Sequence, residues 1–131
     1  MLPQLNRLKH WRDFQAVYQK GIRRSGRHLT LRGLRQPVST GHGSNRSKWN
    51  EEEQPPTRIG ISISQKVSKK AVVRNRIKRQ IRAALRQLLP GLSPGWRLVV
   101  VVRPTALECD YAQILRELEQ LMVEIEVVNG H

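Results

Sequence analysis

The residues of this chain that most clearly carry chemistry are basic, and they gather in one stretch. Residues 54–107 contain twelve Lys or Arg and no Asp or Glu, although a solvated charge run ordinarily mixes both signs to relieve self-repulsion. The densest part runs Arg74-Asn75-Arg76-Ile77-Lys78-Arg79. Because guanidinium and ammonium groups bind phosphate oxygens well, this stretch predicts a polyanionic partner.

The apolar residues inside the basic stretch recur at helical spacing. At about 100° per residue, one arc of a helix over 71–89 collects Val73, Ile77, Ile81, Ala84 and Leu88, with Leu85 at its edge. The neighbouring arc collects Arg74, Lys78, Arg79, Arg82 and Arg86, and Lys66, Lys69 and Lys70 precede the helix. The pattern predicts a helix that packs against a core by one face and presents cations to the phosphates of a nucleic acid on another.

The rest of the composition disfavours other chemistries. The net charge is +14 and the pI is about 11.4, as expected of a nucleic-acid-binding protein. Cys109 is the only cysteine, the four histidines are scattered, and no carboxylates are spaced for a two-metal site. We therefore expect no catalytic residues and no cofactor or metal bound by the protein. With no transmembrane run, signal peptide or lipidation motif, we expect a cytoplasmic protein without membrane or evident protein partners.

The remaining elements follow from their periodicity. A helix is expected at 8–20 with the stripe Trp11, Phe14 and Tyr18, widened by Val17. Strands are expected at 29–34, 58–64 and 98–102, and more weakly around 22–25. Ser68 is the expected cap of the basic helix, Pro90-Gly91 its end, and Asp110 with Gln113 a capping box for a last helix through about Met122. This order, α-β-β-β-α-β-α, predicts an α+β fold with three helices and a single mixed sheet of about four strands.

We expect one RNA-binding domain over residues 1–131. Residues 36–57 have the composition of a disordered loop, which we interpret as an insertion at a hairpin tip, and residues 124–131 are expected to form a flexible tail.

Placed on these elements, several motifs together resemble the bacterial ribonuclease P protein subunit. The strand Gly60-Ile61-Ser62-Ile63-Ser64, then Lys66, then Arg74-Asn75-Arg76-Ile77-Lys78-Arg79 resembles the signature of that family. The opening Arg7-Leu8-Lys9, Asp13-Phe14, Val17-Tyr18 and Gly21 resembles its first helix, and 98–102 followed by Arg103 resembles its last strand. The resemblance covers the chain except for residues 36–57 and the tail.

The resemblance implies the small protein cofactor of an RNA enzyme that removes the 5′ leader from precursor tRNA. The implied partners are the catalytic RNA and precursor tRNA, and the RNA carries the active site with its Mg²⁺. The implied fold has a left-handed strand–helix–strand crossover, against the usual preference for right-handed ones. It belongs to the class named after the second domain of a small-subunit ribosomal protein.

The same resemblance assigns residues to two surfaces. Arg74, Asn75, Arg76, Lys78, Arg79 and Arg82 match the motif that contacts the catalytic RNA. Phe14, Tyr18, Thr30, Arg32 and Ser62 match positions that line a cleft for the leader. Arg32 stands where some members have an aromatic residue, so a phosphate or cation–π contact replaces base stacking there. Gln65 stands where Lys is common.

Three alternatives remain open from the residues. A ribosomal protein or RNA chaperone explains the charge but not the full-length pattern. A protein-only nuclease lacks a carboxylate cluster, and in a helix-turn-helix protein no central strand follows the basic helix. Cleavage of precursor tRNA by the protein alone, by the RNA alone and by both separates these classes.

Overall fold

The computed structural model describes residues 6–35 and 56–125, and within them it contains three α-helices and four strands. The elements are α1 (Trp11–Lys20), β1 (Ile22–Ser25), β2 (Leu29–Arg35), β3 (Arg58–Ser62), α2 (Ala71–Leu88), β4 (Trp96–Val102) and α3 (Tyr111–Glu124), with the 3-10 turns η4 (Leu89–Gly91) and η5 (Pro104–Glu108). The predicted α+β order is confirmed, including the weakly marked strand β1.

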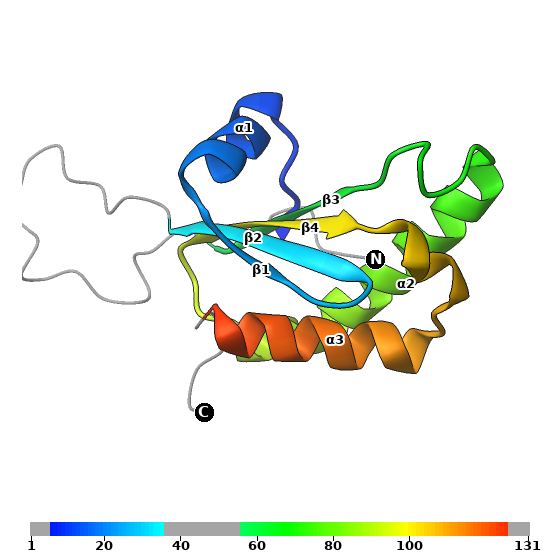
Figure 1. Ribbon diagram of the computed structural model, residues 1–131. Helices are drawn as coiled ribbons and strands as arrows, with labels where there is room; N and C mark the ends of the chain where they lie inside the picture. The colour runs from blue at the N-terminus through cyan, green and yellow to red at the C-terminus, as the bar shows by residue number, and fades with distance from the viewer. Residues whose placement is uncertain (1–5, 36–55, 126–131) are drawn as a thin grey trace, which may run out of the picture.

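The four strands form one mixed sheet in the order β1-β2-β4-β3. β2 is antiparallel to both β1 and β4, whereas β3 is parallel to β4. α1 lies on one face of the sheet, and α2 and α3 cover the other (Figure 1). Viewed with α2 in front and the parallel strands pointing up, β4 lies to the left of β3, so the crossover through α2 is left-handed (Figure 1).

The main core lies between the sheet and the two helices α2 and α3. Alternate residues of β4, Leu98, Val100 and Val102, point to this side and pack with Leu29, Leu31 and Ile59 of the neighbouring strands. The helices contribute Ile77, Ile81, Ala84 and Leu85 from α2, and Ile114, Leu118, Leu121 and Met122 from α3. The predicted apolar arc of the basic helix is therefore its buried face. Each Leu, Ile, Val or Met side chain among them contributes about 1.5–3 kcal/mol when fully buried.

A smaller core under α1 corrects the predicted first helix. Val17, the residue expected only to widen the stripe, is fully buried, whereas Trp11 is 67% exposed. The helix begins at Trp11 and not at residue 8, because the preceding backbone is extended and pairs with the sheet edge. There the Leu8 N–H donates to the Ile59 carbonyl at 3.0 Å. Leu8, Val17 and Val99 form the buried centre of this second cluster.

The connection from β2 to β3 is not a hairpin, which corrects the predicted hairpin tip. β4 lies between these strands and pairs with both of them, so β2 and β3 are not neighbours in the sheet. Residues 36–55 lie outside the described part, but Thr57, assigned to the loop, is buried. Its hydroxyl donates to the Ser93 carbonyl and accepts the Trp96 N–H, which ties the start of β3 to the start of β4.

The ends of α2 and α3 test two predicted caps. The capping box of Asp110 and Gln113 is confirmed. Ser68 is not the cap of α2, because the helix begins after Lys70, which makes no side-chain cap. α3 extends to Glu124 and Ile125 is only 2% exposed, so the predicted tail at 124–131 began too early. Residues 126–131 lie outside the described part.

One glycine allows α1 to pack closely on the sheet. A Cβ at Gly60 would collide with the ring of Phe14, whereas a Cβ at Gly91 would have no neighbour within 4 Å. We expect Gly60→Ala to lower the free energy of unfolding by about 1–3 kcal/mol. Gly91→Ala, the matched control, should change it by less than about 0.5 kcal/mol. Urea denaturation followed by circular dichroism measures both, and equal stability of the two variants would contradict this packing.

Candidate nucleic-acid interface

The cations of α2 lie beside its buried face, as the helical spacing predicts. Arg76, Arg79 and Arg86 are exposed, as is Asn75, and Arg74, Lys78 and Arg82 are half-buried. Lys66, Lys69 and Lys70, in the segment before the helix, are exposed as well. Within residues 6–35 and 56–125, no carboxylate lies within ion-pair distance of any of these cations. Their charges therefore stay available for a phosphate-bearing partner.

Arg74 also has a structural contact. Its Nη1 donates to the Ser68 carbonyl at 2.8 Å, and the Ser68 hydroxyl accepts the Lys70 N–H at 3.2 Å. These two bonds join the segment before the helix to the first turn of α2. Arg74 is therefore partly engaged within the protein, whereas Arg76 and Arg79 make no such contact in the described structure.

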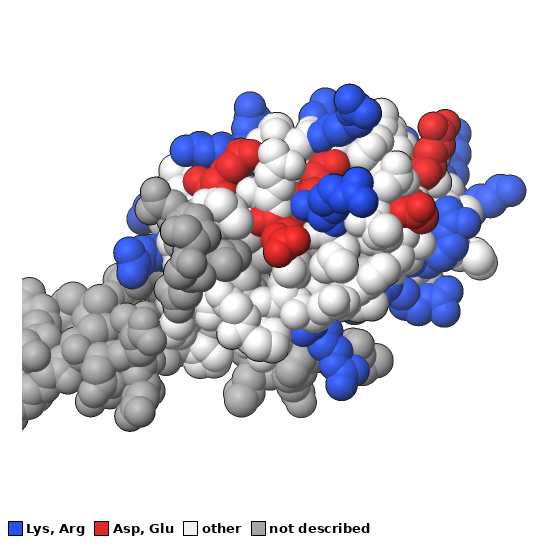
Figure 2. All heavy atoms as spheres, turned by 90° about the horizontal axis from the view of Figure 1, so that it is seen from below, with Lys and Arg blue, Asp and Glu red and all other residues white. Residues whose placement is uncertain are grey.

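The acidic residues are separated from this basic surface. Of the acidic residues that the structure describes, only Asp13 lies outside α3 and the segment before it, and Asp13 pairs with Arg97 at 3.7 Å. The others are Glu108, Asp110, Glu117, Glu119 and Glu124. Figure 2, a view of the side that carries α3, shows these red residues interspersed with blue ones. α3 therefore covers a mixed-charge side, and α2 carries a one-sided charge.

The sheet surface beside α1 carries a row of hydroxyl groups. Strand register places Ser25, Thr30, Val101 and Ser62 side by side across all four strands. The hydroxyls of Ser25 and Thr30 are 3.3 Å apart. α1 covers the next row, where Val17 packs with Val99 and Phe14 lies against Gly60. Thr30 and Ser62 of the predicted cleft are thus brought into one row, and Ser25, which the sequence analysis missed, extends it.

Tyr18 and Arg32 form a pair at the edge of this row. The Arg32 guanidinium lies 4.8 Å from the centre of the Tyr18 ring, and its Nη1 donates to the Tyr18 carbonyl at 3.4 Å. This is a cation–π contact within the protein. The contact predicted for Arg32, with RNA in place of base stacking, stays a prediction. Tyr18 remains 37% exposed, so part of its ring is accessible to a ligand.

Phe14 connects the two predicted surfaces. It is half-buried and packs against the small core under α1, so it contributes to packing and also borders open space. That space is a hollow of about 230 Å³ at the β3 edge, whose lining includes Phe14, Lys78 and Arg82. Arg7 and Lys9 line it too. Neither was predicted as a site residue, although both belong to the motif that carries the resemblance.

Three further features of the described residues concern metal binding, thiol chemistry and membrane spanning. Residues 6–35 and 56–125 hold no cluster of three or more His, Cys, Asp or Glu suited to a metal ion. Burial, aided by the nearby Glu117 carboxylate, raises the pKa of the Cys109 thiol, which disfavours the nucleophilic thiolate form. In the same residues no helix has both the length and the hydropathy needed to cross a bilayer. The cytoplasmic location stays a prediction.

Comparisons with known proteins agree over nearly the whole chain. A family model described as Ribonuclease P matches residues 2–126. The ribonuclease P protein component of a Cyanothece species is 57% identical over 100% of both chains. That of Microcystis aeruginosa is 52% identical over 99% of this chain and 98% of its own length.

Solved structures show the same fold. The ribonuclease P protein of Staphylococcus aureus superposes with a TM-score of 0.73 at 28% identity, covering 95% of this chain and 98% of that one. The Thermotoga maritima protein, at 20% identity, has a TM-score of 0.70 over 95% of this chain and 98% of its own and supports the fold alone. The basic helix, the hydroxyl row beside α1 and the sheet order thus occur in a chain that belongs to the bacterial ribonuclease P protein family.

Proposed function

We propose that this chain is the protein subunit of ribonuclease P and assists the Mg²⁺-dependent removal of the 5′ leader from precursor tRNA. The observation that carries the proposal is a hollow lined by cations of α2 together with an aromatic residue of α1. Lys78 and Arg82 share one hollow with Phe14, so a single RNA-binding surface extends from the helix to the sheet. In this proposal the RNA subunit supplies the active site and its metal ions.

The two parts of the surface fit two kinds of RNA contact. α2 offers guanidinium groups without acidic partners, which suit the closely spaced phosphates of a folded RNA. Its first turn contains no acidic residue, so the positive end of the helix dipole adds to the same field. The cleft combines the ring of Tyr18 with the hydroxyls of Thr30 and Ser62. Aromatic and hydroxyl groups together suit a single strand, whose bases stack and whose sugars form hydrogen bonds.

The binding roles follow from this geometry. Positive charge near the leader lowers phosphate repulsion between precursor and catalytic RNA, and therefore lowers the salt or Mg²⁺ concentration that binding requires. A cleft that accepts only the leader adds affinity for precursor tRNA but none for mature tRNA. Because of this difference in affinity, the holoenzyme binds its substrate, precursor tRNA, more tightly than its product, mature tRNA. The same difference therefore favours both substrate binding and product release in one catalytic cycle.

The first prediction from the proposed function concerns the source of the cleavage activity. The purified protein alone should not cleave precursor tRNA, and adding it to the RNA subunit should lower the Mg²⁺ concentration needed for cleavage. Cleavage assays with the protein, the RNA and both, over a Mg²⁺ titration, measure this. Turnover by the protein without RNA would overturn the assignment of catalysis to the RNA.

The second prediction concerns the exposed cations of α2. Arg76→Ala with Arg79→Ala removes two phosphate contacts without touching the buried face, so circular dichroism and thermal melting should change little. Affinity for the catalytic RNA should fall, and the slope of log K against log salt should flatten by up to about 0.9 per lost contact. Arg116→Ala on α3 is the control and should leave the slope unchanged. Arg74→Ala should also cost some stability, because Arg74 bonds to Ser68.

The third prediction concerns the cleft. Tyr18→Ala should weaken holoenzyme binding of precursor tRNA by about 1–3 kcal/mol, the contribution of one stacked base, and should leave mature tRNA almost unaffected. Tyr18→Phe keeps the ring and should bind like the parent protein. Phe14→Ala is a poorer probe, because the Phe14 ring also packs under α1. Equal losses for both RNAs with a folded Tyr18→Ala protein would exclude a leader-specific cleft.

A further inference from the structure

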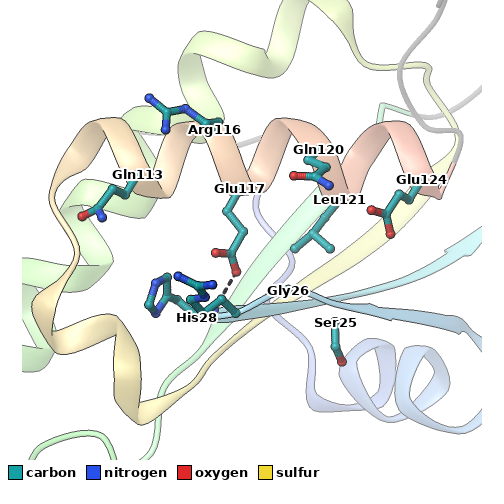
Figure 3. Close-up of a pocket in the computed structure, with 10 residues that line it drawn as sticks. Ser25, Gly26, His28, Gln113, Arg116, Glu117, Gln120, Leu121 and Glu124 are labelled. Carbon is teal, nitrogen blue, oxygen red and sulfur yellow. Dashed lines mark hydrogen bonds between the residues drawn. The ribbon is translucent and has the colours of Figure 1, made fainter.

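The turn between β1 and β2 is held by a carboxylate of α3, which lies on the face of the sheet opposite α1. Glu117 of α3 points toward this turn, beside a hollow of about 310 Å³ (Figure 3). Its Oε2 accepts the backbone N–H of His28 at 2.8 Å and that of Leu29 at 2.6 Å. Hydrogen bonds from backbone N–H groups to a carboxylate are shorter and stronger than those to a neutral acceptor.

The carbonyl groups of the same turn are held from the segment that follows β4. The Arg103 Nη1 donates to the Gly26 carbonyl at 3.0 Å, and the Arg103 N–H donates to the His28 carbonyl at 3.0 Å. The Thr105 hydroxyl donates to the Arg27 carbonyl at 3.1 Å. The backbone N–H groups of the turn therefore bind Glu117 of α3, and its carbonyl groups bind residues 103–105. The position of the turn is thus restrained from two sides.

Close packing at Gly26 makes the contact with Glu117 possible. A Cβ at this position would lie 2.5 Å from Oε2 of Glu117 and 2.8 Å from its Cδ. Any larger residue therefore requires the Glu117 carboxylate or the turn to shift. The same contact can thus be disturbed from either partner, which provides two independent tests.

The turn connects the two strands that begin the hydroxyl row. Ser25 directly precedes Gly26, and Thr30 directly follows Leu29, whose N–H Glu117 binds. The paired hydroxyls of Ser25 and Thr30 lie 3.3 Å apart. A shift of the turn would therefore move both hydroxyls relative to Tyr18 and Ser62, although Glu117 itself lies on the α3 side of the sheet.

We propose that Glu117 is a positioning residue for the leader cleft: it holds the β1–β2 turn so that the Ser25–Thr30 end of the hydroxyl row lies where single-stranded RNA binds. The inference rests on the proposed function of the cleft. It assigns to α3, which carries none of the predicted RNA contacts, an indirect part in substrate discrimination.

The test compares precursor and mature tRNA binding to the reconstituted holoenzyme. Glu117→Ala should weaken precursor binding at least about fivefold, the equivalent of roughly 1 kcal/mol, and should leave mature tRNA binding unchanged. Glu117→Gln, which keeps an acceptor oxygen, should restore part of the loss. Glu119→Ala removes an exposed carboxylate of the same helix and is the matched control, with no effect on either RNA.

Gly26→Ala provides the second approach and should reproduce the leader-specific loss with Glu117 intact. Hydrogen exchange at the His28 and Leu29 amides should accelerate in both Glu117→Ala and Gly26→Ala, showing that the contact has been broken. Faster exchange with unchanged precursor binding would overturn the inference, as would equal losses for both RNAs. If Tyr18→Ala is leader-specific and Glu117→Ala is not, the cleft stands and only the positioning role fails.

Discussion

The structure depends on how one strongly basic helix is held against a core. α2 carries cations along one side and, in the described part of the chain, has no acidic partner to offset them. Mutual repulsion of like charges disfavours the compact state. The compensation comes from the opposite side of the helix, where Ile77, Ile81, Ala84 and Leu85 are completely buried against the sheet and α3. Apolar packing therefore keeps the charge in place and leaves it available for RNA.

The position of α2 decides what the other elements do. Because α2 connects two adjacent parallel strands, it must cross one face of the sheet, and α3 packs beside it on that face. The other face is left to α1, which is too short to cover it. The uncovered part is the hydroxyl row, bordered by Tyr18 and Arg32. The hydroxyl row and the basic helix thus share one cause, the unequal cover of the two faces. Residues of α1 and of α2 together line the hollow at the β3 edge.

Several site residues have more than one physical role. Phe14 packs under α1 and borders the hollow shared with α2. Arg74 belongs to the predicted RNA-binding motif, but it also ties down the segment before its helix. Arg32 covers part of the Tyr18 ring, so the surface beside α1 presents a guanidinium next to an aromatic group. In such residues a mutation changes binding and local structure together, and exposed neighbours on the same element are the cleaner probes.

The sequence by itself determined the elements and the division of α2 into a buried arc and a cationic side, because both depend on local spacing. The residues of the leader cleft came from the family resemblance and stay a prediction. The helical period of α2 separated its buried arc from its cations, and the box of Asp110 and Gln113 marked the start of α3. Strand order is different, since it depends on which distant segments pair. Only the tertiary structure placed β4 between β2 and β3, aligned Ser25 with Ser62 across four strands, and brought Glu117 to a turn far away in the chain. It also left Trp11 exposed and buried Val17, because the side of α1 that faces the sheet depends on close contacts such as that of Phe14 with Gly60, which periodicity does not encode.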